Sequence, residues 1–511
     1  MLYNSFEFIF VFLPLALVGY FVAGRFHGNT LQLSWIIAAS CIFYAFWDPI
    51  YIFLLVGSLL ANFILGQQLM KHRHKLVLVA GIALNVSLLA YFKYRGFIVT
   101  NFAALADLQV EIPKLVLPLG ISFFTFQKIA YLVDVYKGRV IERSLLRYAA
   151  FITFFPQLIA GPIVHYVPLM RQFDPKRPHV PRGTDLGIGI MFFVIGLAKK
   201  VGIADNLAPY ADRLFATANA SVPLGFFEAW LAVLTYGFQI YFDFSGYSDM
   251  AIGLARMFGI RLPLNFDSPY KARSIIDFWR RWHITLSRFL RDYVYIPLGG
   301  SHHGLTLQLC ALLVTMLLGG LWHGANWTFV IWGGVHGLLL AINHLWRATA
   351  LSDISESLLG APAYNALCLA ATFLSVMAAW VLFRSQSLAA ADFILSGLIG
   401  ANGFGAALPD YVLLHGVPAH KLIQSLFETQ SWTIVPITAT AICAGLLFVV
   451  WVLPNSQEIM SYRVLLPVRS RWRFARWRPN AAWFAIAVGL FYWSLSCMVM
   501  LDIRPFTYFA F

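Results

Sequence analysis

The sequence predicts an all-α fold, a polytopic bundle of membrane-spanning helices. Hydrophobic residues make up 60% of the 511 residues and charged residues 12%, against roughly 45–50% and about 25% in an average soluble domain. Aromatic residues contribute 16%. So few charges cannot cover such a core in water, so lipid must surround much of the chain. The composition therefore disfavours a soluble enzyme, a nucleic-acid-binding domain, a disordered scaffold and a secreted disulfide domain.

Twelve apolar stretches approach the roughly 20 residues that a helix needs to cross a bilayer. Basic connections between them are expected on the cytoplasmic side, where they contact anionic lipid head groups and account for the net charge of +14. With this orientation the spans alternate consistently and both chain ends lie outside. The predicted spans are residues 6–24, 31–47, 50–65, 76–92, 115–133, 186–204, 224–244, 305–321, 327–346, 364–383, 433–453 and 481–500. The basic connections are residues 71–75, 137–147, 171–182, 271–291 and 463–478, and a longer external connection is expected at 385–432.

The apolar stretch 149–164 must enter and leave the membrane on the same side, because basic connections flank both of its ends. Pro156, Gly161 and Pro162 interrupt it, and a straight spanning helix does not tolerate this pattern. Irregular backbone at membrane depth occurs where protein or water covers it. We therefore expect a re-entrant segment beside a cavity. Lys199 and Lys200 lie late in a span, and we expect them to face a polar interior.

His323 is the clearest candidate for chemistry. Apolar spans flank it, and glycines at 319, 320 and 324 allow backbone or substrate to approach closely. Ionisable groups at membrane depth are costly and are retained where a cavity needs them. A neutral imidazole can take and return a proton near pH 7, which suits a general base acting on a hydroxyl. Trp322 and Trp327 can wall the pocket, and Asn326 can orient the ring if the helix continues; the alternative is a histidine buried for packing.

His283 lies in an arginine-rich stretch with interleaved apolar residues, which predicts an amphipathic helix on the cytoplasmic surface. Clustered basic side chains can bind lipid phosphates or the phosphates of a nucleotide-like donor. The candidate phosphate-binding residues are Lys271, Arg280, Arg281 and Arg288.

Other polar residues are weaker candidates. Asp243 and Asp249 can bind a metal or divide acid and base roles, but a structural polar network is favoured, with Arg256 as a possible partner of Asp249. A Ser245–His323–Asp243 triad lacks a nucleophile-elbow context. His336 is interpreted as a packing histidine, and His165, His302 and His303 as solvated. The five cysteines show neither metal spacing nor a disulfide framework, and no metal site is predicted.

Three motifs resemble the membrane-bound O-acyltransferase family, and within it the branch of alginate O-acetylases that modify bacterial exopolysaccharides. They are Tyr241-Phe242-Asp243-Phe244-Ser245-Gly246-Tyr247-Ser248-Asp249, Phe278-Trp279-Arg280-Arg281-Trp282-His283 and Gly320-Leu321-Trp322-His323-Gly324-Ala325-Asn326-Trp327. The resemblance is dense over the first two-thirds of the chain and rests on hydropathy alone in the last third.

The resemblance implies one acyltransferase domain over residues 1–511, with a catalytic core at about 115–346 and a central water-filled funnel. The family's invariant histidine corresponds to His323, and a second polar position to His283. It also implies a multi-pass protein of the bacterial inner membrane with no bound cofactor. Cytosolic acetyl-CoA would be the donor, and an SGNH-like periplasmic acetyltransferase would pass the acetyl group to a polysaccharide.

We then expect His323 to act as the base, with Asn326, His283 or a tryptophan N–H stabilising the oxyanion. A polysaccharide exporter or lipid-carrier flippase is the alternative, since such proteins also have about twelve spans. It would need charges distributed along a path and, in many cases, two related halves, whereas here charges and histidines concentrate between Asp243 and His336. A membrane glycosyltransferase or polymerase would need acidic residues in an outer loop that contact a metal or lipid diphosphate.

Overall fold

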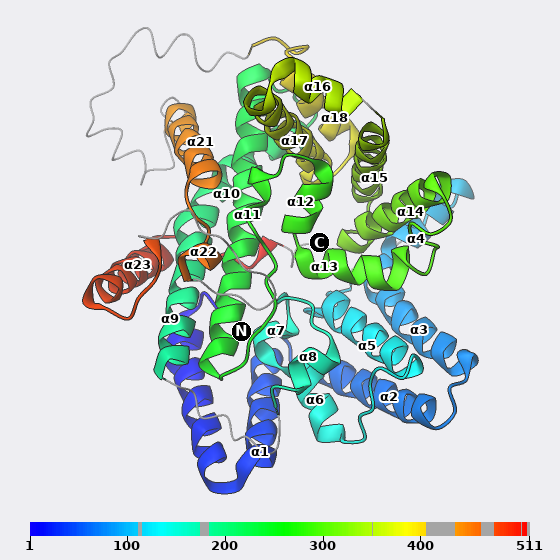
Figure 1. The fold of residues 1–511 in the computed structure, drawn as a ribbon, viewed down its shortest axis with the longest axis vertical. Coiled ribbons are helices and arrows are strands. Elements are labelled where there is room, and N and C mark those ends of the chain that lie inside the picture. The colour runs from blue at the N-terminus through cyan, green and yellow to red at the C-terminus, as the bar shows by residue number, and fades with distance from the viewer. Residues whose placement is uncertain are drawn as a thin grey trace. The chain divides into compact units, whose positions relative to one another are not determined.

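A computed structural model describes residues 1–110, 115–173, 183–349, 351–404, 435–460, 475–501 and 503–507 (Figure 1). Every regular element in these ranges is a helix, which confirms the predicted all-α class. Three predicted connections fall partly outside the described residues, at 174–182, 405–432 and 463–474.

The chain forms two compact units, residues 1–201 with 244–265 and 456–511, and residues 202–243 with 266–455. Helix α11 (Phe226–Met257) and the π-helical turn η3 (Ala198–Ala204) belong to both. The first unit holds η1 (Phe8–Phe12), α1 (Leu13–Ala45), α2 (Tyr51–Lys71), α3 (Lys75–Leu89), η2 (Ala90–Tyr94), α4 (Arg95–Leu105), α5 (Ile121–Tyr136), α6 (Leu145–Thr153), α7 (Phe155–Leu158), α8 (Tyr166–Met170), α9 (Gly183–Leu197), α22 (Ser456–Met460) and α23 (Ala481–Met500). The second holds α10 (Asp205–Asn219), η4 (Pro269–Lys271), α12 (Ile275–Arg281), α13 (Ile284–Leu290), η5 (Arg291–Tyr295), α14 (Leu305–His323), α15 (Trp327–Ala348), α16 (Leu351–Leu359), α17 (Ala361–Arg384), α18 (Leu388–Leu398) and α21 (Val435–Val452).

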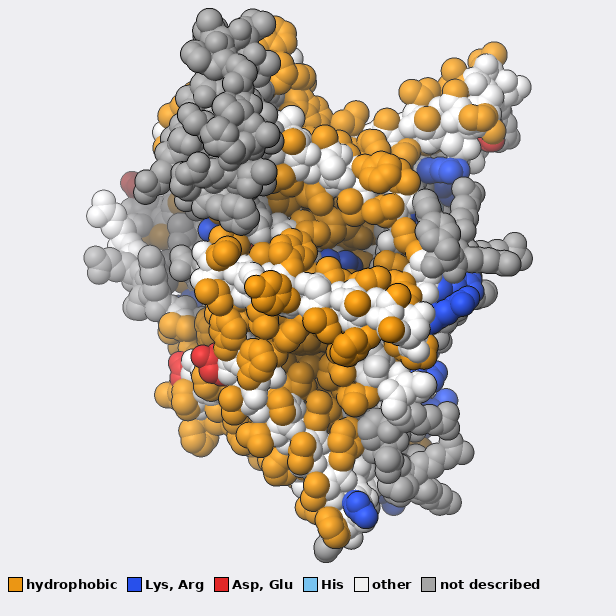
Figure 2. Space-filling view, turned by 90° about the vertical axis from the view of Figure 1, so that its left-hand side faces the viewer, with side chains coloured by type: hydrophobic (Ala, Val, Ile, Leu, Met, Phe, Trp, Pro, Cys, Tyr) orange, Lys and Arg blue, Asp and Glu red, His pale blue; other side chains and the backbone are white. Residues whose placement is uncertain are grey.

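Eight helical stretches within the described ranges are long and apolar enough to cross a membrane, and each overlaps a predicted span. Their outward side chains are those of a lipid-facing surface: Leu105 is 87% exposed, and Leu76 and Phe53 are 78% and 77% exposed. Hydrophobic side chains cover most of the face drawn in Figure 2, with few charged side chains between them. The chain is therefore a multi-pass membrane protein. The eight stretches are Phe8–Phe26, Tyr51–Lys71, Lys75–Leu105, Gly183–Asn219, Leu305–His323, Trp327–Ala348, Ala361–Arg384 and Ala481–Met500.

Helix α1 contains two antiparallel arms, which correspond to the predicted spans 6–24 and 31–47. Trp35 Nε1 donates a hydrogen bond to the Ala16 carbonyl at 3.0 Å, and Gln32 Nε2 donates one to the Tyr20 carbonyl at 3.4 Å. In a straight helix residues 16 and 35 would be about 28 Å apart, at ~1.5 Å per residue. The chain must therefore reverse between the arms, and Figure 1 shows the two arms side by side.

The stretch 149–164 has the broken backbone expected of a re-entrant segment. Helix α6 ends at Thr153, the short helix α7 follows, and residues 161–165 are irregular. Gln157 Nε2 donates to the Phe151 carbonyl at 2.6 Å, so a side chain satisfies backbone that the interrupted helix leaves open. Protein covers the segment, since Phe151, Phe155 and Leu158 are fully buried.

Within the first unit, α9 and α11 approach backbone to backbone. A Cβ atom at Gly196 would lie 2.5 Å from the Gly246 carbonyl oxygen, and one at Gly189 would lie 2.7 Å from that of Gly253. Gly189 and Gly196 lie seven residues apart on α9, and Gly246 and Gly253 lie seven residues apart on α11. Each helix therefore presents its two glycines on one face. Small residues allow this close packing of membrane helices.

Lys199 faces a polar interior, as predicted, and binds Asp249. Its Nζ lies 2.6 Å from Asp249 Oδ2 and 3.1 Å from Ser456 Oγ, and Gln457 Nε2 donates to Asp249 Oδ1 at 2.9 Å. Asp249 is 1% exposed. The favoured polar network is thus present around Asp249.

The suggested pairing of Asp249 with Arg256 is wrong. Arg256 binds Asp185 of α9 instead, at 2.6 Å, because a closer cation, Lys199, occupies the carboxylate of Asp249.

Candidate active site

His323 is the last residue of α14, in the second unit, and aromatic rings from three helices surround it. Its ring centroid lies 4.8 Å from that of Trp322, 5.2 Å from Trp332 of α15 and 5.1 Å from Phe383 of α17, all in edge-on arrangements. The residue is 3% exposed. We call these three rings the aromatic cage.

The cage differs in part from the expected walls. Trp322 was predicted to wall the pocket and does contact the ring. Trp327 is 52% exposed instead, because it begins α15 and its side chain turns outward. Trp332 and Phe383 were not predicted, since they come from helices 9 and 60 residues further along the chain.

The glycines near His323 bring α14 and α15 together. A Cβ atom at Gly320 would lie 2.2 Å from the Phe329 carbonyl oxygen, and one at Gly333 would lie 2.2 Å from that of Met316. At Gly324 a Cβ atom would overlap the Phe329 ring. These glycines therefore accommodate neighbouring protein atoms, and the close helix pair fixes the position of His323 relative to Trp332.

Asn326 has a structural position between the two helices. The helix does not continue past His323, so the condition for Asn326 to share its face is not met. Asn326 caps α15 instead: its Oδ1 accepts from the Thr328 amide at 3.2 Å, and its Nδ2 donates to the Gln386 carbonyl at 2.9 Å. Both ends of the amide thus contact backbone.

The single amphipathic helix expected around His283, from Arg280 to Arg291, is not formed. Two short helices, α12 and α13, are separated by Trp282 and His283, and the His283 backbone is left-handed with φ 42° and ψ 53°. His283 is fully buried, with its ring 6.1 Å from that of Trp322. Burial lowers the pKa of His283 from 6.5 to about 3, so its imidazole is neutral near pH 7.

His336 belongs to the same cluster. Trp279 Nε1 donates a hydrogen bond to His336 Nδ1 at 3.3 Å, so the neutral ring carries its proton on Nε2. The His336 ring lies 4.7 Å from Trp332, which in turn contacts His323. Trp322 and Trp332 therefore connect His283, His323 and His336 into one buried group. His336 packs against aromatic rings, as predicted.

The candidate phosphate-binding residues near α12 differ in exposure. Arg280 is exposed. Arg281 Nε lies 2.9 Å from Asp277 Oδ1, and its Nη1 donates to the Asp267 carbonyl at 3.2 Å. Arg280 is thus more accessible to a ligand than Arg281.

Lys271 and Arg288 lie on either side of these two arginines in sequence. Lys271 Nζ donates to the Leu453 carbonyl at 2.6 Å, and Arg288 is partly buried in α13.

Within the described part of the chain, no three His, Cys, Asp or Glu side chains form a metal-binding group. His302 and His303 are exposed, as predicted.

Comparison with known proteins identifies relatives of the chain. Residues 142–357 match the profile of the membrane-bound O-acyltransferase family. The chain is 43% identical to peptidoglycan O-acetyltransferase of Helicobacter pylori over 434 residues, covering 79% of this chain and 80% of that protein. It is 36% identical to probable alginate O-acetylase of Pseudomonas syringae over the full length of both. Teichoic acid D-alanyltransferase of Streptococcus thermophilus is 28% identical over 45% of this chain and 57% of its own length.

Proposed function

The chain belongs to the membrane-bound O-acyltransferase family, and on this premise we propose that it transfers an acetyl group from cytosolic acetyl-CoA toward a cell-surface polysaccharide. It is an O-acyltransferase by family. The names of its relatives, an alginate O-acetylase and a peptidoglycan O-acetyltransferase, support an acetyl donor and a polysaccharide acceptor. All of these relatives are bacterial, which supports the inner membrane as its location.

The observation that carries the proposal is the position of His323. An ionisable side chain at the end of an apolar span is costly, yet three helices enclose it with aromatic rings. In our proposal the neutral imidazole accepts the proton of the acceptor hydroxyl. The hydroxyl oxygen attacks the thioester carbonyl, the carbon–sulfur bond breaks, and the coenzyme A thiolate receives the proton from the imidazolium.

The tetrahedral intermediate requires hydrogen-bond donors for its oxyanion. Trp332 Nε1 has no acceptor among the described residues, and the indole borders the His323 ring. We assign this N–H the role of oxyanion donor, in place of Asn326, whose amide contacts backbone. Since His323 is only 3% exposed, the predicted funnel must give the substrates their path to the ring.

The basic residues near α12 are proposed to bind the donor's phosphates. Arg280 is the first contact, because its side chain is exposed. Arg281, Arg288 and Lys271 would complete the site by exchanging their present protein contacts for phosphate oxygens. On the far side, an SGNH-like periplasmic acetyltransferase would receive the acetyl group.

Labelled donors test this proposal. Inverted membrane vesicles containing the protein, its outer partner and the polymer are supplied with acetyl-labelled acetyl-CoA or, as the control, with acetyl-labelled acetyl phosphate. We expect ester-linked label in the polymer from acetyl-CoA alone. Equal labelling from acetyl phosphate, or none from acetyl-CoA, would remove acetyl-CoA as the donor.

A further inference from the structure

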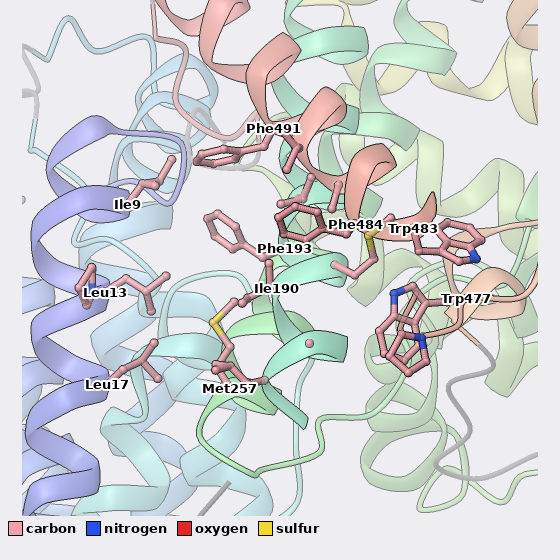
Figure 3. Close-up of a pocket in the computed structure, with 18 of the residues that line it drawn as sticks. Ile9, Leu13, Leu17, Ile190, Phe193, Met257, Trp477, Trp483, Phe484 and Phe491 are labelled. Atoms are coloured by element: carbon pink, nitrogen blue, oxygen red, sulfur yellow. The ribbon is translucent and has the colours of Figure 1, made fainter. Parts of the chain in front are cut away.

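An apolar pocket of about 930 Å³ lies in the first unit, between the first arm of α1, α9 and α23 (Figure 3). Its lining residues recur every three or four positions, so each helix contributes one stripe parallel to its axis. The stripe on η1 and the first arm of α1 runs from Ile9 to Phe21, about 18 Å at ~1.5 Å per residue. This length slightly exceeds half of a hydrocarbon core of about 30 Å, so the pocket is about as long as one leaflet is deep and extends a little past it.

The amino-terminal half of α23 borders this pocket, and most of its side chains are exposed. Phe484 is 72% exposed and Val488 is 52% exposed, whereas the buried residues of α23, Ser494 and Met498, lie in its other half. Figure 3 shows Phe484 and Phe491 on the α23 side and Ile9, Leu13 and Leu17 on the α1 side. Apolar spaces of this kind do not hold ordered water, so hydrocarbon must fill it in a membrane.

One end of the pocket is polar and aromatic. Trp477 lies over Gly187 of α9, where a Cβ atom would be 3.6 Å from the indole, and Trp483 Nε1 donates to the Arg476 carbonyl at 3.1 Å. Tryptophans fixed in this way are typical of the head-group level of a bilayer. The basic connection before α23 is predicted to be cytoplasmic, so this end faces the cytoplasmic leaflet.

The charge at this end favours an anion. Arg478 is the charged residue among the described residues that line the pocket, and its side chain is exposed. The nearby carboxylate of Asp185 is neutralised by Arg256 at 2.6 Å. A phosphate at the tryptophan end would therefore meet a cation that has no carboxylate partner among the described residues, and lipid hydrocarbon would lie along the stripes.

We propose that this pocket binds one anionic phospholipid of the cytoplasmic leaflet, with its phosphate at Arg478 and its acyl chains between α1, α9 and α23. A transmembrane helix of another protein fits less well, because such helices pack through small residues. Here Phe, Leu, Ile and Trp side chains dominate the lining, and Gly187 is covered by Trp477. Flexible acyl chains can follow this bulky surface.

Native mass spectrometry of the full-length protein tests the site. The protein is reconstituted in nanodiscs of equal parts phosphatidylglycerol and phosphatidylcholine and released into mild detergent. Ala487→Trp fills the pocket, and Ala485→Trp makes the same change at an exposed position of α23 outside the lining. We expect one bound phospholipid in the wild type and in Ala485→Trp, and at least tenfold lower occupancy in Ala487→Trp.

The identity of the head group is tested with Arg478→Gln, against Arg73→Gln as the control, since Arg73 is an exposed arginine on the same predicted side. One arginine near a phosphate corresponds to about fivefold enrichment of phosphatidylglycerol over phosphatidylcholine. We expect this enrichment in the wild type and in Arg73→Gln, and we expect Arg478→Gln to lose it. This comparison does not depend on whether Ala487→Trp folds correctly. A wild type without lipid, equal occupancy in both tryptophan variants, a preference that survives Arg478→Gln, or a co-purifying protein helix in place of lipid would each overturn the proposal.

Discussion

His283 occupies a backbone position that few side chains tolerate. Its φ of 42° and ψ of 53° lie in the left-handed region, which costs a non-glycine residue about 1–3 kcal/mol. Asparagine is among the residues that enter this region most readily. The full burial of the ring supplies the packing that holds this conformation, and it keeps the imidazole uncharged beside Trp322.

This burial predicts a pH dependence of stability. The pKa of His283 is about 3 in the folded protein and about 6.5 when unfolded. The unfolded chain therefore gains a proton as the pH falls below about 6.5, and the folded protein does not until the pH approaches 3. The stability that the protein gains by burying His283 in its neutral form is fully present above about pH 6.5 and is lost as the pH falls from there toward 3.

His283→Asn keeps a residue suited to the left-handed backbone and removes the titration. Between about pH 6.5 and 5 the wild type should lose about 2 kcal/mol more stability than this variant. Thermal unfolding midpoints in detergent at the two pH values measure the difference. Equal losses in the two proteins would show that His283 protonates readily in the folded state.

At the residue scale, the sequence identifies single polar side chains of interest, but it does not identify the residues that contact them in the folded protein. His323 is conspicuous because an ionisable group interrupts apolar spans. Its contacts with Trp332 and Phe383 depend on how three helices meet, and spacing along one helix contains no such information. Asn326 illustrates the same limit, because its predicted role required a helix that ends at His323.

At the element scale, the α14–α15 pair depends on glycines that admit no side chain. Gly320→Ala would place a methyl group 2.2 Å from the Phe329 carbonyl oxygen, whereas at Gly334 the nearest atom is Leu317 Cδ2 at 3.4 Å. Gly320→Ala should destabilise the protein by about 1–3 kcal/mol or more. Gly334→Ala should be neutral or slightly stabilising, since alanine favours helix. Thermal midpoints in detergent compare the two, and equal stability would contradict the close packing.

The Lys199–Asp249 pair connects α11 with η3. Lys199→Met leaves the buried Asp249 charge uncompensated and should cost about 3–5 kcal/mol. Adding Asp249→Leu should recover much of this loss, because no lone charge then remains. Arg291→Met serves as the control, since Arg291 is 59% exposed in its pair with Asp292 and should change stability by less than about 1 kcal/mol. Unfolding midpoints of the wild type and the three variants measure these differences. If Lys199→Met left the midpoint unchanged, the network would be contradicted.

The sequence predicts helix breaks only where a residue type marks them. Pro156, Gly161 and Pro162 mark the broken segment at 149–164, and the structure has it. The break between α12 and α13 carries no proline or glycine; tertiary packing holds His283 in a left-handed conformation there. A regular amphipathic pattern across that position therefore predicted one helix where two are formed.

At the scale of the whole molecule, hydropathy located the spans well. The arms of α1 correspond to two predicted spans, and eight described stretches qualify by length and composition. α11, predicted to span at 224–244, is one helix of 32 residues, Phe226–Met257. Buried Asp243 and Asp249 make this helix more polar than a lipid-facing one. The predicted total of twelve spans and the central funnel stay predictions.

Membrane orientation has its own test. Residues 49 and 73 flank α2 and are exposed, and the basic segment 71–75 is predicted to be cytoplasmic. In a cysteine-free background, Pro49→Cys should react with a membrane-impermeant maleimide in intact cells. Arg73→Cys should react only after the cells are lysed. The reverse pattern would invert the predicted topology.

The central claim is that His323 performs the acyl transfer. The most direct measurement is the amount of ester-linked acetyl on the surface polymer in cells expressing the wild type, His323→Ala or His302→Ala at equal membrane levels. His302 is an exposed histidine away from the cage, so its variant controls for loss of a histidine. His302→Ala should match the wild type, whereas His323→Ala should lose at least ~100-fold of the activity. Wild-type acetylation by a correctly inserted His323→Ala protein would contradict the account.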